Sequence, residues 1–168
     1  MINALFAVDY HGGMGFNGTL PWPHNAEDLA NFKKLTKHNV VVMGRKTWDD
    51  PKMPKPLNQR EVYVASNSPV RYAGQISGDL SLELLELEKK HSNQIIWVVG
   101  GPQILESCRS LFDQIHLTHF NDSYKVDTKI DLKTFLTGFT PRLATTALDS
   151  KSVFIRYESI FKRSNTSP

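Results

Sequence analysis

The sequence predicts a single α/β domain with a mixed, mostly parallel central sheet, flanking helices and a C-terminal antiparallel hairpin. Three observations support this fold class. Short, fully apolar runs alternate with helical segments as far as residue 120, which is typical of parallel strands covered on both faces. From about residue 140, two strand-like segments flank Asp149-Ser150-Lys151, which favours a hairpin. The chain has 168 residues without a recognisable repeat or linker, a size that suits one hydrophobic core.

Local patterns predict the elements of the first part of the chain. Residues 2–8 (INALFAV) are apolar enough for a buried strand, and a glycine-rich loop follows at residues 12–18. Asn25 suits the N-cap of a helix that runs to about Lys37, because its side chain can accept a backbone N–H. Residues 40–43 form a four-residue apolar run, which predicts a central strand.

The later elements follow from the same reasoning. They are a short helix at 44–47, a strand at 61–66, a helix at 80–91, a strand at 95–99, a helix ending near residue 110 and a strand at 115–120. Cys108 lies in the last of these helices, and we expect a buried, unreactive thiol there. We expect residues 1–163 to form the domain and residues 164–168 to be a flexible tail.

Composition excludes several classes of protein. The net charge is +3, from 20 Lys and Arg against 17 Asp and Glu, and no dense basic run argues for nucleic acid. No apolar stretch approaches the roughly 18–20 residues that span a bilayer, and no basic segment precedes the first apolar run. A single cysteine favours a reducing compartment such as the cytoplasm. No metal-ligand spacing appears, so we predict no metal.

The first chemically informative segment is the helix after the glycine-rich loop. Helical spacing places Asp28, Phe32 and Leu35 on one face, with Leu29 beside them. A carboxylate in an apolar stripe is costly unless it has a partner or takes up a proton. Asp28 is therefore either a ligand-binding or acid–base group, or simply an acid that favours the helix N-terminus. The neighbouring Glu27 falls on a polar face, where we expect it to be solvated.

Three further segments leave their roles open on residue chemistry alone. The glycine pair Gly100-Gly101 joins an apolar strand to a helix, and it is either a tight turn or a backbone site for a phosphate. Arg45 and Lys46 stand at a helix start, where cations oppose the helix dipole. They are either a solvated basic turn or a site for an anion. Arg60 precedes a strand, and it either binds a carboxylate or faces water.

Together, these segments resemble dihydrofolate reductase along nearly the whole chain. The most specific stretch is Gly-Met-Gly-Phe-Asn-Gly-Thr-Leu-Pro-Trp at residues 13–22, which is similar to that family's mobile active-site loop. Asp28 followed four residues later by Phe32, then Met-Gly-Arg-Lys-Thr-Trp at 43–48, continue the match. Val-Gly-Gly at 99–101 and Leu-Thr-His at 117–119 complete it. Five segments in the family's order and spacing are specific, although each alone is weak.

The resemblance implies NADPH-dependent reduction of 7,8-dihydrofolate by hydride transfer to C6, with protonation at N5 promoted by Asp28. Thr118 would hydrogen-bond the carboxylate side of that network, and Trp22 would help position a water near it. Leu29, Phe32 and Leu57 would pack on the substrate, and Arg60 would pair with its α-carboxylate. Arg45, aided by Ser66, would bind the 2′-phosphate that distinguishes NADPH from NADH.

The resemblance assigns the remaining cofactor contacts to the ends of the strands and to the loop. Thr47, Gly100 and Gly101 would hold the pyrophosphate region, and the family's peptide between the two glycines is usually cis. The other cofactor-binding residues implied are Ala7, Gly15, Leu20, Gly44, Lys46, Val99 and Gln103. The implied partners are dihydrofolate and antifolate inhibitors, and small size favours a monomer.

Three positions depart from the family's pattern, and two other functions compete with the one that the resemblance implies. Leu105 stands where many members have a tyrosine, Pro102 follows the glycine pair where a small residue is usual, and Gln59 replaces a common glycine. One competing function is a pyrimidine reductase of riboflavin synthesis, which should lack the Leu-Pro-Trp loop and the embedded acid. The other is a non-catalytic or structural member of the same fold.

Overall fold

Nine strands form one sheet in the computed structural model, which describes residues 1–142 and 146–163. Their order is β10-β11-β7-β1-β6-β3-β4-β5, and β9 also pairs with β11. The bounds are β1 Ile2–Val8, β3 Val40–Gly44, β4 Glu61–Ala65, β5 Gly74–Ile76, β6 Ile96–Val98, β7 Gln114–Phe120, β9 Phe139–Pro141, β10 Thr146–Ala147 and β11 Ser152–Ser159. The strands from β7 to β5 are parallel, and only the pairs that involve β11 are antiparallel within the described sheet. The predicted fold class is therefore confirmed.

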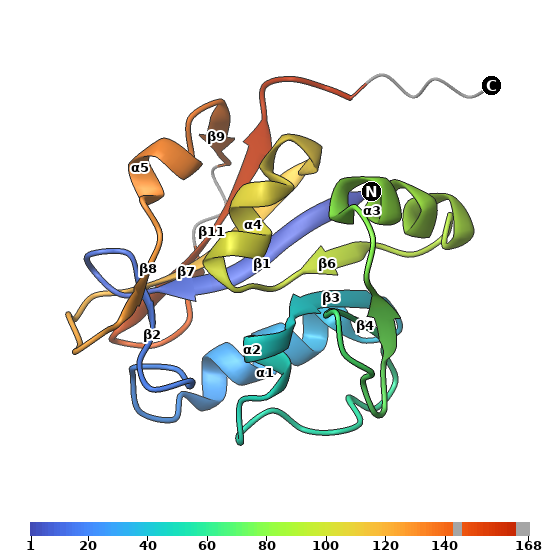
Figure 1. Cartoon of the computed structure of the whole chain (residues 1–168). Helices are drawn as coiled ribbons and strands as arrows, with labels where there is room; N and C mark the ends of the chain where they lie inside the picture. Colours follow the sequence, from blue (N-terminus) through green and yellow to red (C-terminus); the bar gives the residue numbers. More distant parts are fainter. Residues whose placement is uncertain (143–145, 164–168) are drawn as a thin grey trace.

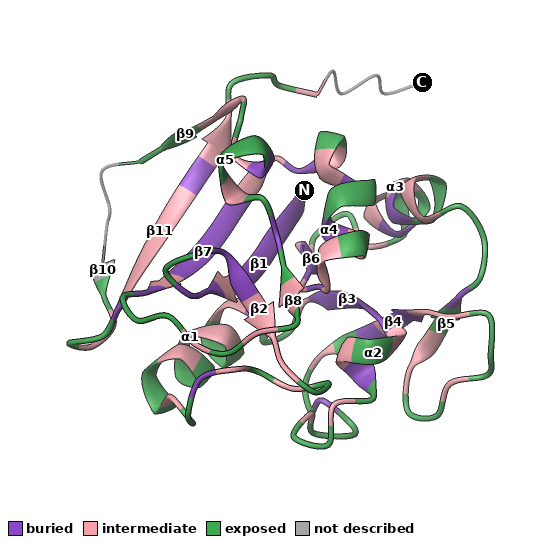
Figure 2. Cartoon of the chain, turned by 60° about the vertical axis from the view of Figure 1, so that its left-hand side comes forward, coloured by how far each residue is buried: buried purple, intermediate pink, exposed green. Residues whose placement is uncertain are grey.

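Helices cover both faces of this sheet (Figure 1). They are α1 Ala26–Thr36, α2 Arg45–Trp48, α3 Leu80–Lys90, α4 Pro102–Ser107 and α5 Leu132–Phe135. The central strands β1, β3 and β6 are buried almost throughout (Figure 2), as their continuous apolar sequences predict. No helix in the described part of the chain is long and apolar enough to cross a bilayer.

Alternating side chains of the strands form two hydrophobic clusters, one on each face of the sheet. The larger contains every second residue of β1 and β3 together with Leu84 and Leu87 of α3 and Leu105 of α4. The smaller contains Val41 and Met43 of β3, together with Trp48 of α2. Cys108 belongs to the larger cluster, and burial raises the pKa of its thiol to about 12, as expected for an unreactive cysteine.

The structure describes the surroundings or backbone of all three residues that depart from the family's pattern. Leu105 is fully buried in the larger cluster, so its side chain is part of the core. Pro102 is the first residue of α4, where its missing N–H costs no helical hydrogen bond. Gln59 adopts a left-handed backbone conformation with φ of 62°, which is the region that favours glycine.

The N-cap predicted for α1 is confirmed, and α3 has a cap of the same kind. Asn25 Oδ1 accepts the backbone N–H of Asp28 at 2.8 Å, and Asp79 Oδ1 accepts that of Leu82 at 3.0 Å. Such a cap satisfies one of the N–H groups that a helix start leaves without an intrahelical partner. The predicted helix end at about Lys37 is one residue beyond the observed end at Thr36.

Several short elements were not predicted, and two predictions need correction. β2 (Gly13–Gly15) and β8 (Thr128–Lys129) form a second, two-stranded sheet, and β5 and α5 were also missed. These segments are too short for a periodic signal, and their pairing depends on distant residues. The expected long first strand of the hairpin is described as β9 and β10, separated by residues outside the described part. The helix expected to reach residue 110 ends at Ser107 and continues as a 3₁₀ turn. The expected flexible tail at 164–168 lies outside the described residues.

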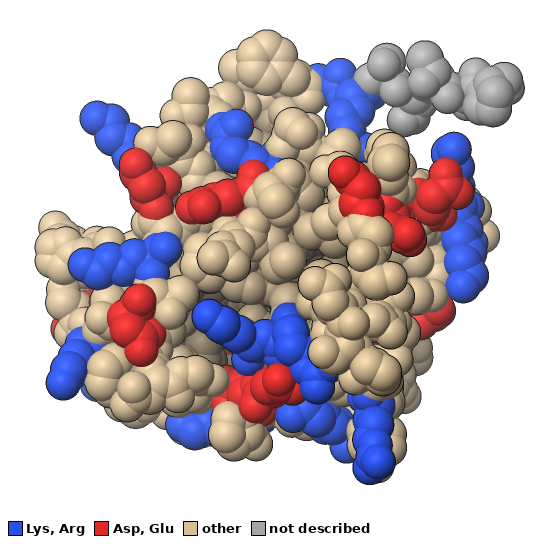
Figure 3. Space-filling view, in the orientation of Figure 1, with Lys and Arg blue, Asp and Glu red and all other residues tan. Residues whose placement is uncertain are grey.

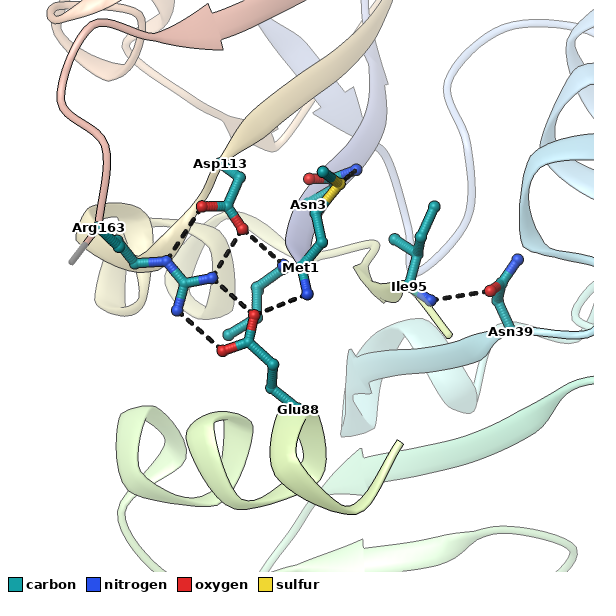
Figure 4. A network of polar contacts seen from close by, with 8 residues as sticks. Met1, Asn3, Asn39, Glu88, Ile95, Asp113 and Arg163 are labelled. Atoms are coloured by element: carbon teal, nitrogen blue, oxygen red, sulfur yellow. Dashed lines mark hydrogen bonds and ion pairs between the residues drawn. The ribbon is translucent and has the colours of Figure 1, made fainter. Parts of the chain in front are cut away.

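A charged network joins distant parts of the chain at the edge of the sheet opposite the carboxyl ends of the parallel strands (Figure 4). Arg163 donates to both carboxylate oxygens of Glu88 in α3, at 2.7 and 3.0 Å. It also donates to Asp113, at 2.7 and 3.1 Å, and Asp113 accepts the backbone N–H of Ile2 at 2.9 Å. The network therefore ties β1, α3, β7 and the segment after β11 together.

Candidate active site

The parallel arrangement brings several of the predicted cofactor-binding residues to one edge of the sheet, whereas Arg60 stands before the start of β4. Parallel strands end on the same side, and in open α/β sheets ligands bind beyond those carboxyl ends. Ala7 lies near the end of β1, Gly44 ends β3, Ser66 follows β4 and Val99 follows β6. The glycine-rich loop and α1 follow β1 at the same edge.

Asp28 and Thr118 form the central polar pair of the site. Thr118 Oγ1 donates a hydrogen bond of 2.7 Å to Asp28 Oδ1, which joins α1 to β7. Thr118 is 1% exposed and lies beside Ala7 in the β1–β7 register. Burial raises the pKa of Asp28, the hydrogen bond from Thr118 lowers it, and the charge of Asp149 raises it; the net direction is upward. The arrangement suits a carboxyl that changes protonation state near its working pH.

The predicted apolar and cationic substrate residues lie on α1 and on the segment after α2. Phe32 is half-buried, Leu29 is 45% exposed and Leu57 is buried in the smaller hydrophobic cluster. Arg60 donates from Nε to the Asn58 carbonyl at 3.0 Å and from Nη1 to Thr36 Oγ1 at 3.3 Å. Burial lowers the pKa of Arg60, and the two hydrogen bonds hold its guanidinium beside α1.

Backbone groups of two strand-to-helix turns approach each other at the glycine pair. The Gly44 N–H donates to the Gly100 carbonyl at 2.8 Å, and the Gly100–Gly101 peptide is cis, as the resemblance implies. Gly100 has a φ of 127°, which a side chain would strain. A side chain at Gly44 would meet Ile104 at 3.0 Å. Thr47 Oγ1 lies 3.9 Å from the positions where both glycines of the pair would carry Cβ.

A basic group stands next to this turn. Arg45 Nε donates to Asp49 at 3.0 and 3.1 Å, and its Nη1 donates to Ser66 Oγ at 3.3 Å and to the Pro69 carbonyl at 3.1 Å. These contacts fix the guanidinium plane, and the Arg45 side chain as a whole is 40% exposed. Lys46 beside it is exposed. Basic side chains gather over α2, beside the hollow in the middle of this face (Figure 3).

The glycine-rich loop is anchored at both ends to the segment between β7 and β8. The buried Asp9 accepts the N–H groups of His11, Gly13 and Tyr124 at 2.7–3.0 Å. At the other end, the Asn17 N–H donates to Asp127 Oδ2 at 2.9 Å. Between these anchors Gly15 belongs to β2, which pairs with β8.

The end of the same loop is held by aromatic side chains. Trp22 is 5% exposed and stacks on Phe120 with ring centroids 4.4 Å apart. Tyr124 meets Trp22 edge-on at 6.3 Å. Leu20, two residues before, is 44% exposed, so the loop presents an apolar side chain to solvent. The stack holds the end of the loop against the end of β7.

Reasoning from sequence missed three polar residues around the site, namely Asp9, Asp127 and Asp149, and it also missed a second role of Asn25. Asn25 was predicted as a helix cap, but its Nδ2 also donates to Asp149 Oδ2 at 2.7 Å. Asp149 was assigned only to a turn, because nothing near it in sequence indicates a contact with α1. Within the described residues, no group of three or more His, Cys, Asp or Glu side chains could hold a metal ion.

Comparisons with known proteins converge on one family. A family model described as dihydrofolate reductase matches residues 1–145. The chain is 32% identical to dihydrofolate reductase type 9 of Escherichia coli over 142 residues, which covers 80% of this chain and 78% of that protein. It is 29% identical to the dihydrofolate reductase of Mus musculus over 182 residues, covering 96% and 97%. A solved dihydrofolate reductase from Enterococcus faecalis, complexed with NADP(H) and RAB-propyl, gives a TM-score of 0.77 over 96% of this chain and 97% of that chain. At 22% identity, this last likeness concerns the fold.

Proposed function

The chain belongs to the dihydrofolate reductase family, and we propose which of its residues carry out the family's reaction. That reaction is the NADPH-dependent reduction of 7,8-dihydrofolate to 5,6,7,8-tetrahydrofolate. The observation that carries the proposal is the Asp28–Thr118 pair, a carboxyl with a raised pKa at the ligand-binding edge of the sheet. A family member that had lost catalysis would have no need of this costly group.

Asp28 is the acid–base group of the proposed mechanism. It hydrogen-bonds the amide and amino edge of the pterin and promotes protonation at N5. Thr118 keeps one carboxylate oxygen oriented, which leaves the other for the substrate. Bound NADPH supplies the hydride that C6 accepts. The chain contributes orientation, exclusion of water and one proton-transfer group.

The substrate's remaining parts meet apolar and cationic side chains in this proposal. Phe32 and Leu29 pack on the pterin and aminobenzoyl groups from α1, and Leu57 closes the opposite side. The exposure of Leu29 supports a ligand contact, because a large apolar side chain on a helix face is otherwise solvated at a cost. Arg60, already oriented by Asn58 and Thr36, pairs with the α-carboxylate of the glutamate tail.

The glycine turns and Arg45 fit a phosphorylated dinucleotide. At Gly100 and Gly101 an added Cβ would have no neighbour nearer than 3.9 Å, and the absence of side chains at this turn allows a close approach of the pyrophosphate and the nicotinamide. Arg45, with Ser66 beside it, recognises the 2′-phosphate, and Lys46 adds positive charge. Thr47 and Gly101 hold the pyrophosphate region. The other proposed contacts with NADPH come from Ala7, Gly15, Leu20, Val99 and Gln103.

The loop between β1 and α1 closes the site in the proposed mechanism. Its anchors at Asp9 and Asp127 and the Trp22 stack hold it at the carboxyl edge of the sheet. Trp22 also positions a water near Asp28. Loop closure over the nicotinamide excludes water, and loop opening limits turnover in many enzymes of this kind. We further propose that the protein is a cytoplasmic monomer and that diaminopteridine antifolates inhibit it.

The test is the loss of NADPH absorbance when dihydrofolate is added to the purified protein. We expect a loss that a diaminopteridine antifolate abolishes and that requires dihydrofolate. A pyrimidine substrate of riboflavin synthesis serves as the control for the alternative reductase, and it should not be consumed. NADPH binding without turnover of dihydrofolate would contradict the proposed function and favour a non-catalytic member of the fold.

A further inference from the structure

The amide of Asn25 makes two hydrogen bonds that point in opposite directions. Its Oδ1 accepts the backbone N–H of Asp28 at 2.8 Å, and its Nδ2 donates to Asp149 Oδ2 at 2.7 Å. The first bond caps α1, and the second reaches the turn between β10 and β11, 124 residues later. A continuous path therefore connects this turn to the first turn of the helix that carries the acid–base carboxyl.

Only asparagine among the common cap residues can make both bonds. Serine, threonine, aspartate and asparagine all accept a backbone N–H at a helix start. An aspartate at position 25 would place its second oxygen against the Asp149 carboxylate, and serine or threonine is too short to reach it. Capping alone would allow any of these four residues at position 25. The hydrogen bond to Asp149 explains why the residue is asparagine.

Asp149 is itself fixed on its other side. Its Oδ1 accepts the backbone N–H of Lys151 at 2.8 Å and the hydroxyl of Ser152 at 2.8 Å. Ser152 is fully buried at the start of β11, so the carboxylate is tied to the sheet. Because this carboxylate is fixed to β11, its hydrogen bond with Asn25 restrains the position of α1.

Resting on the proposed function, we propose that Asp149 is a positioning residue for dihydrofolate reduction. Through Asn25 it fixes the first turn of α1, so that Asp28 stays within hydrogen-bonding distance of Thr118. It also places a second negative charge beside the carboxyl that must take up a proton.

The groups around Asp28 make Asp149 the charge that matters at this position. From β7, the neutral Thr118 contacts Asp28, and from the β10–β11 turn the charge of Asp149 acts on it while the Asp149 side chain contacts Asn25. On α1 itself Glu27 is exposed. Outside α1, His24 and Lys151 line the small cavity beside Trp22 and Asn25. The charge of Asp149 adds to burial in raising the pKa of Asp28, which keeps more of the protonated form available.

Exchanging the carboxylate and the amide between positions 25 and 149 distinguishes a positioning role of Asp149 from a purely structural one. D149N keeps the acceptor for Lys151 and Ser152 but sets its amide against the amide of Asn25. N25D keeps the cap but sets two carboxylates together. The double variant N25D/D149N restores both hydrogen bonds with donor and acceptor exchanged, and it moves the negative charge closer to Asp28. The exposed Asp122, changed to Asn, removes the same charge without touching α1 and serves as the matched control.

The readouts are kcat and KM for dihydrofolate, the kinetic isotope effect with deuterated NADPH, and the pH profile of the hydride-transfer rate. We expect each single variant to lose about threefold to tenfold in kcat/KM near neutral pH. The D149N profile should move to lower pH. The double variant should recover to within about twofold of the unmodified enzyme at low pH, with its profile moved to higher pH. D122N should leave both unchanged.

Several results would overturn the inference while leaving the proposed function intact. The first is that the unmodified enzyme is active and D149N has the same pH profile. The second is that the double variant is no more active than the worse of the two single variants. A D122N variant that shifts the profile as much as D149N would also count against it, because bulk charge would then explain the effect. Thermal unfolding of every variant identifies losses caused by misfolding. An inactive unmodified enzyme would instead remove the proposed function itself.

Discussion

At the residue scale, Asp28 combines a costly location with an oriented hydrogen bond. Burial raises the pKa of its carboxyl, while the bond from Thr118 opposes that rise. Because the folded pKa is raised, protonation favours the folded chain, and stability is lost as the pH rises through that value. A residue that lowers the stability of the folded chain at its position is typical of a functional site.

Asp28→Asn should lower the hydride-transfer rate by roughly 10²–10⁴ near neutral pH, because the general acid–base group is lost. The loss should shrink in acid, where the substrate arrives already protonated. Single-turnover measurements between acid and neutral pH provide the test. Glu27→Gln is the control, since Glu27 is the adjacent, exposed acid. An equal loss in both variants would argue against the role of Asp28, and thermal unfolding should show Asp28→Asn to be at least as stable as the unmodified protein.

Arg45 is the residue expected to decide between the two nicotinamide cofactors. Arg45→Leu should weaken NADPH binding by about 1.5–3 kcal/mol, the cost of a lost charged hydrogen bond, and leave NADH binding almost unchanged. Calorimetric titration with both cofactors measures the difference. Lys89→Met removes the same charge from α3, where the side chain is 75% exposed, and should affect neither cofactor. Equal weakening of NADPH and NADH would refute the assignment to the 2′-phosphate.

At the element scale, the second sheet of β2 and β8 depends on a buried carboxylate. Burial opposes ionisation of Asp9, but the backbone N–H groups of Tyr124, Gly13 and His11 outweigh it and lower its pKa. A side chain at Gly13 would lie 2.8 Å from the Asp9 carboxylate, so the packing leaves no room for rearrangement. Asp9 therefore holds two loops together through the backbone N–H groups that it accepts.

Asp9→Asn should cost about 1–3 kcal/mol of unfolding free energy near neutral pH, because one amide N–H then faces a donor in place of an acceptor. Since the folded pKa is lowered, the contribution of Asp9 is present above the unfolded pKa of about 3.9 and disappears as the pH falls through the folded value. Urea unfolding at neutral and acid pH should show the two proteins converging in acid. Asp127→Asn, at the exposed end of the same loops, should cost less. A deficit independent of pH would contradict the role of the charge.

At the scale of the whole molecule, Arg163 joins segments from both ends of the chain. It holds Glu88 and Asp113 together, with side chains only about a quarter exposed. The hydrogen bond from Arg163 lowers the pKa of Glu88 to about 2. Asp113 in turn accepts the N–H of Ile2, so the start of β1 is fixed to the same group.

Arg163→Met should lower the unfolding free energy by about 1–3 kcal/mol near neutral pH, because two partly buried carboxylates lose their partner. The contribution of Glu88 is present above its unfolded pKa of about 4.3 and is lost as the pH falls toward 2. Chemical unfolding across that range is the measurement. Arg142→Met breaks a more exposed pair between Arg142, which follows β9, and Glu158 on β11, and it should have a smaller effect. Equal costs for the two variants would contradict this account of the network.

The sequence alone determined the elements that have a strong local signal. Apolar runs predict β1, β3 and β6, and the caps at Asn25 and the spacing of α1 predict which face carries Asp28. The left-handed conformation at Gln59 also agrees with the family's glycine there. These features depend on neighbouring residues, because hydrogen bonding within a helix turn and the period of a strand are local. The alternation of apolar strands and helices then sufficed to predict the fold class.

The tertiary structure decided the contacts that join distant segments. Thr118 reaches Asp28 across 90 residues, and Asp149 reaches Asn25 across 124. The pairing of β2 with β8 belongs to the same group. Such contacts have no periodic signature, because they depend on which strands are neighbours in the sheet and on the register of each pair. The sequence therefore identified the acid, and only the packed sheet and loops determined what holds it in place.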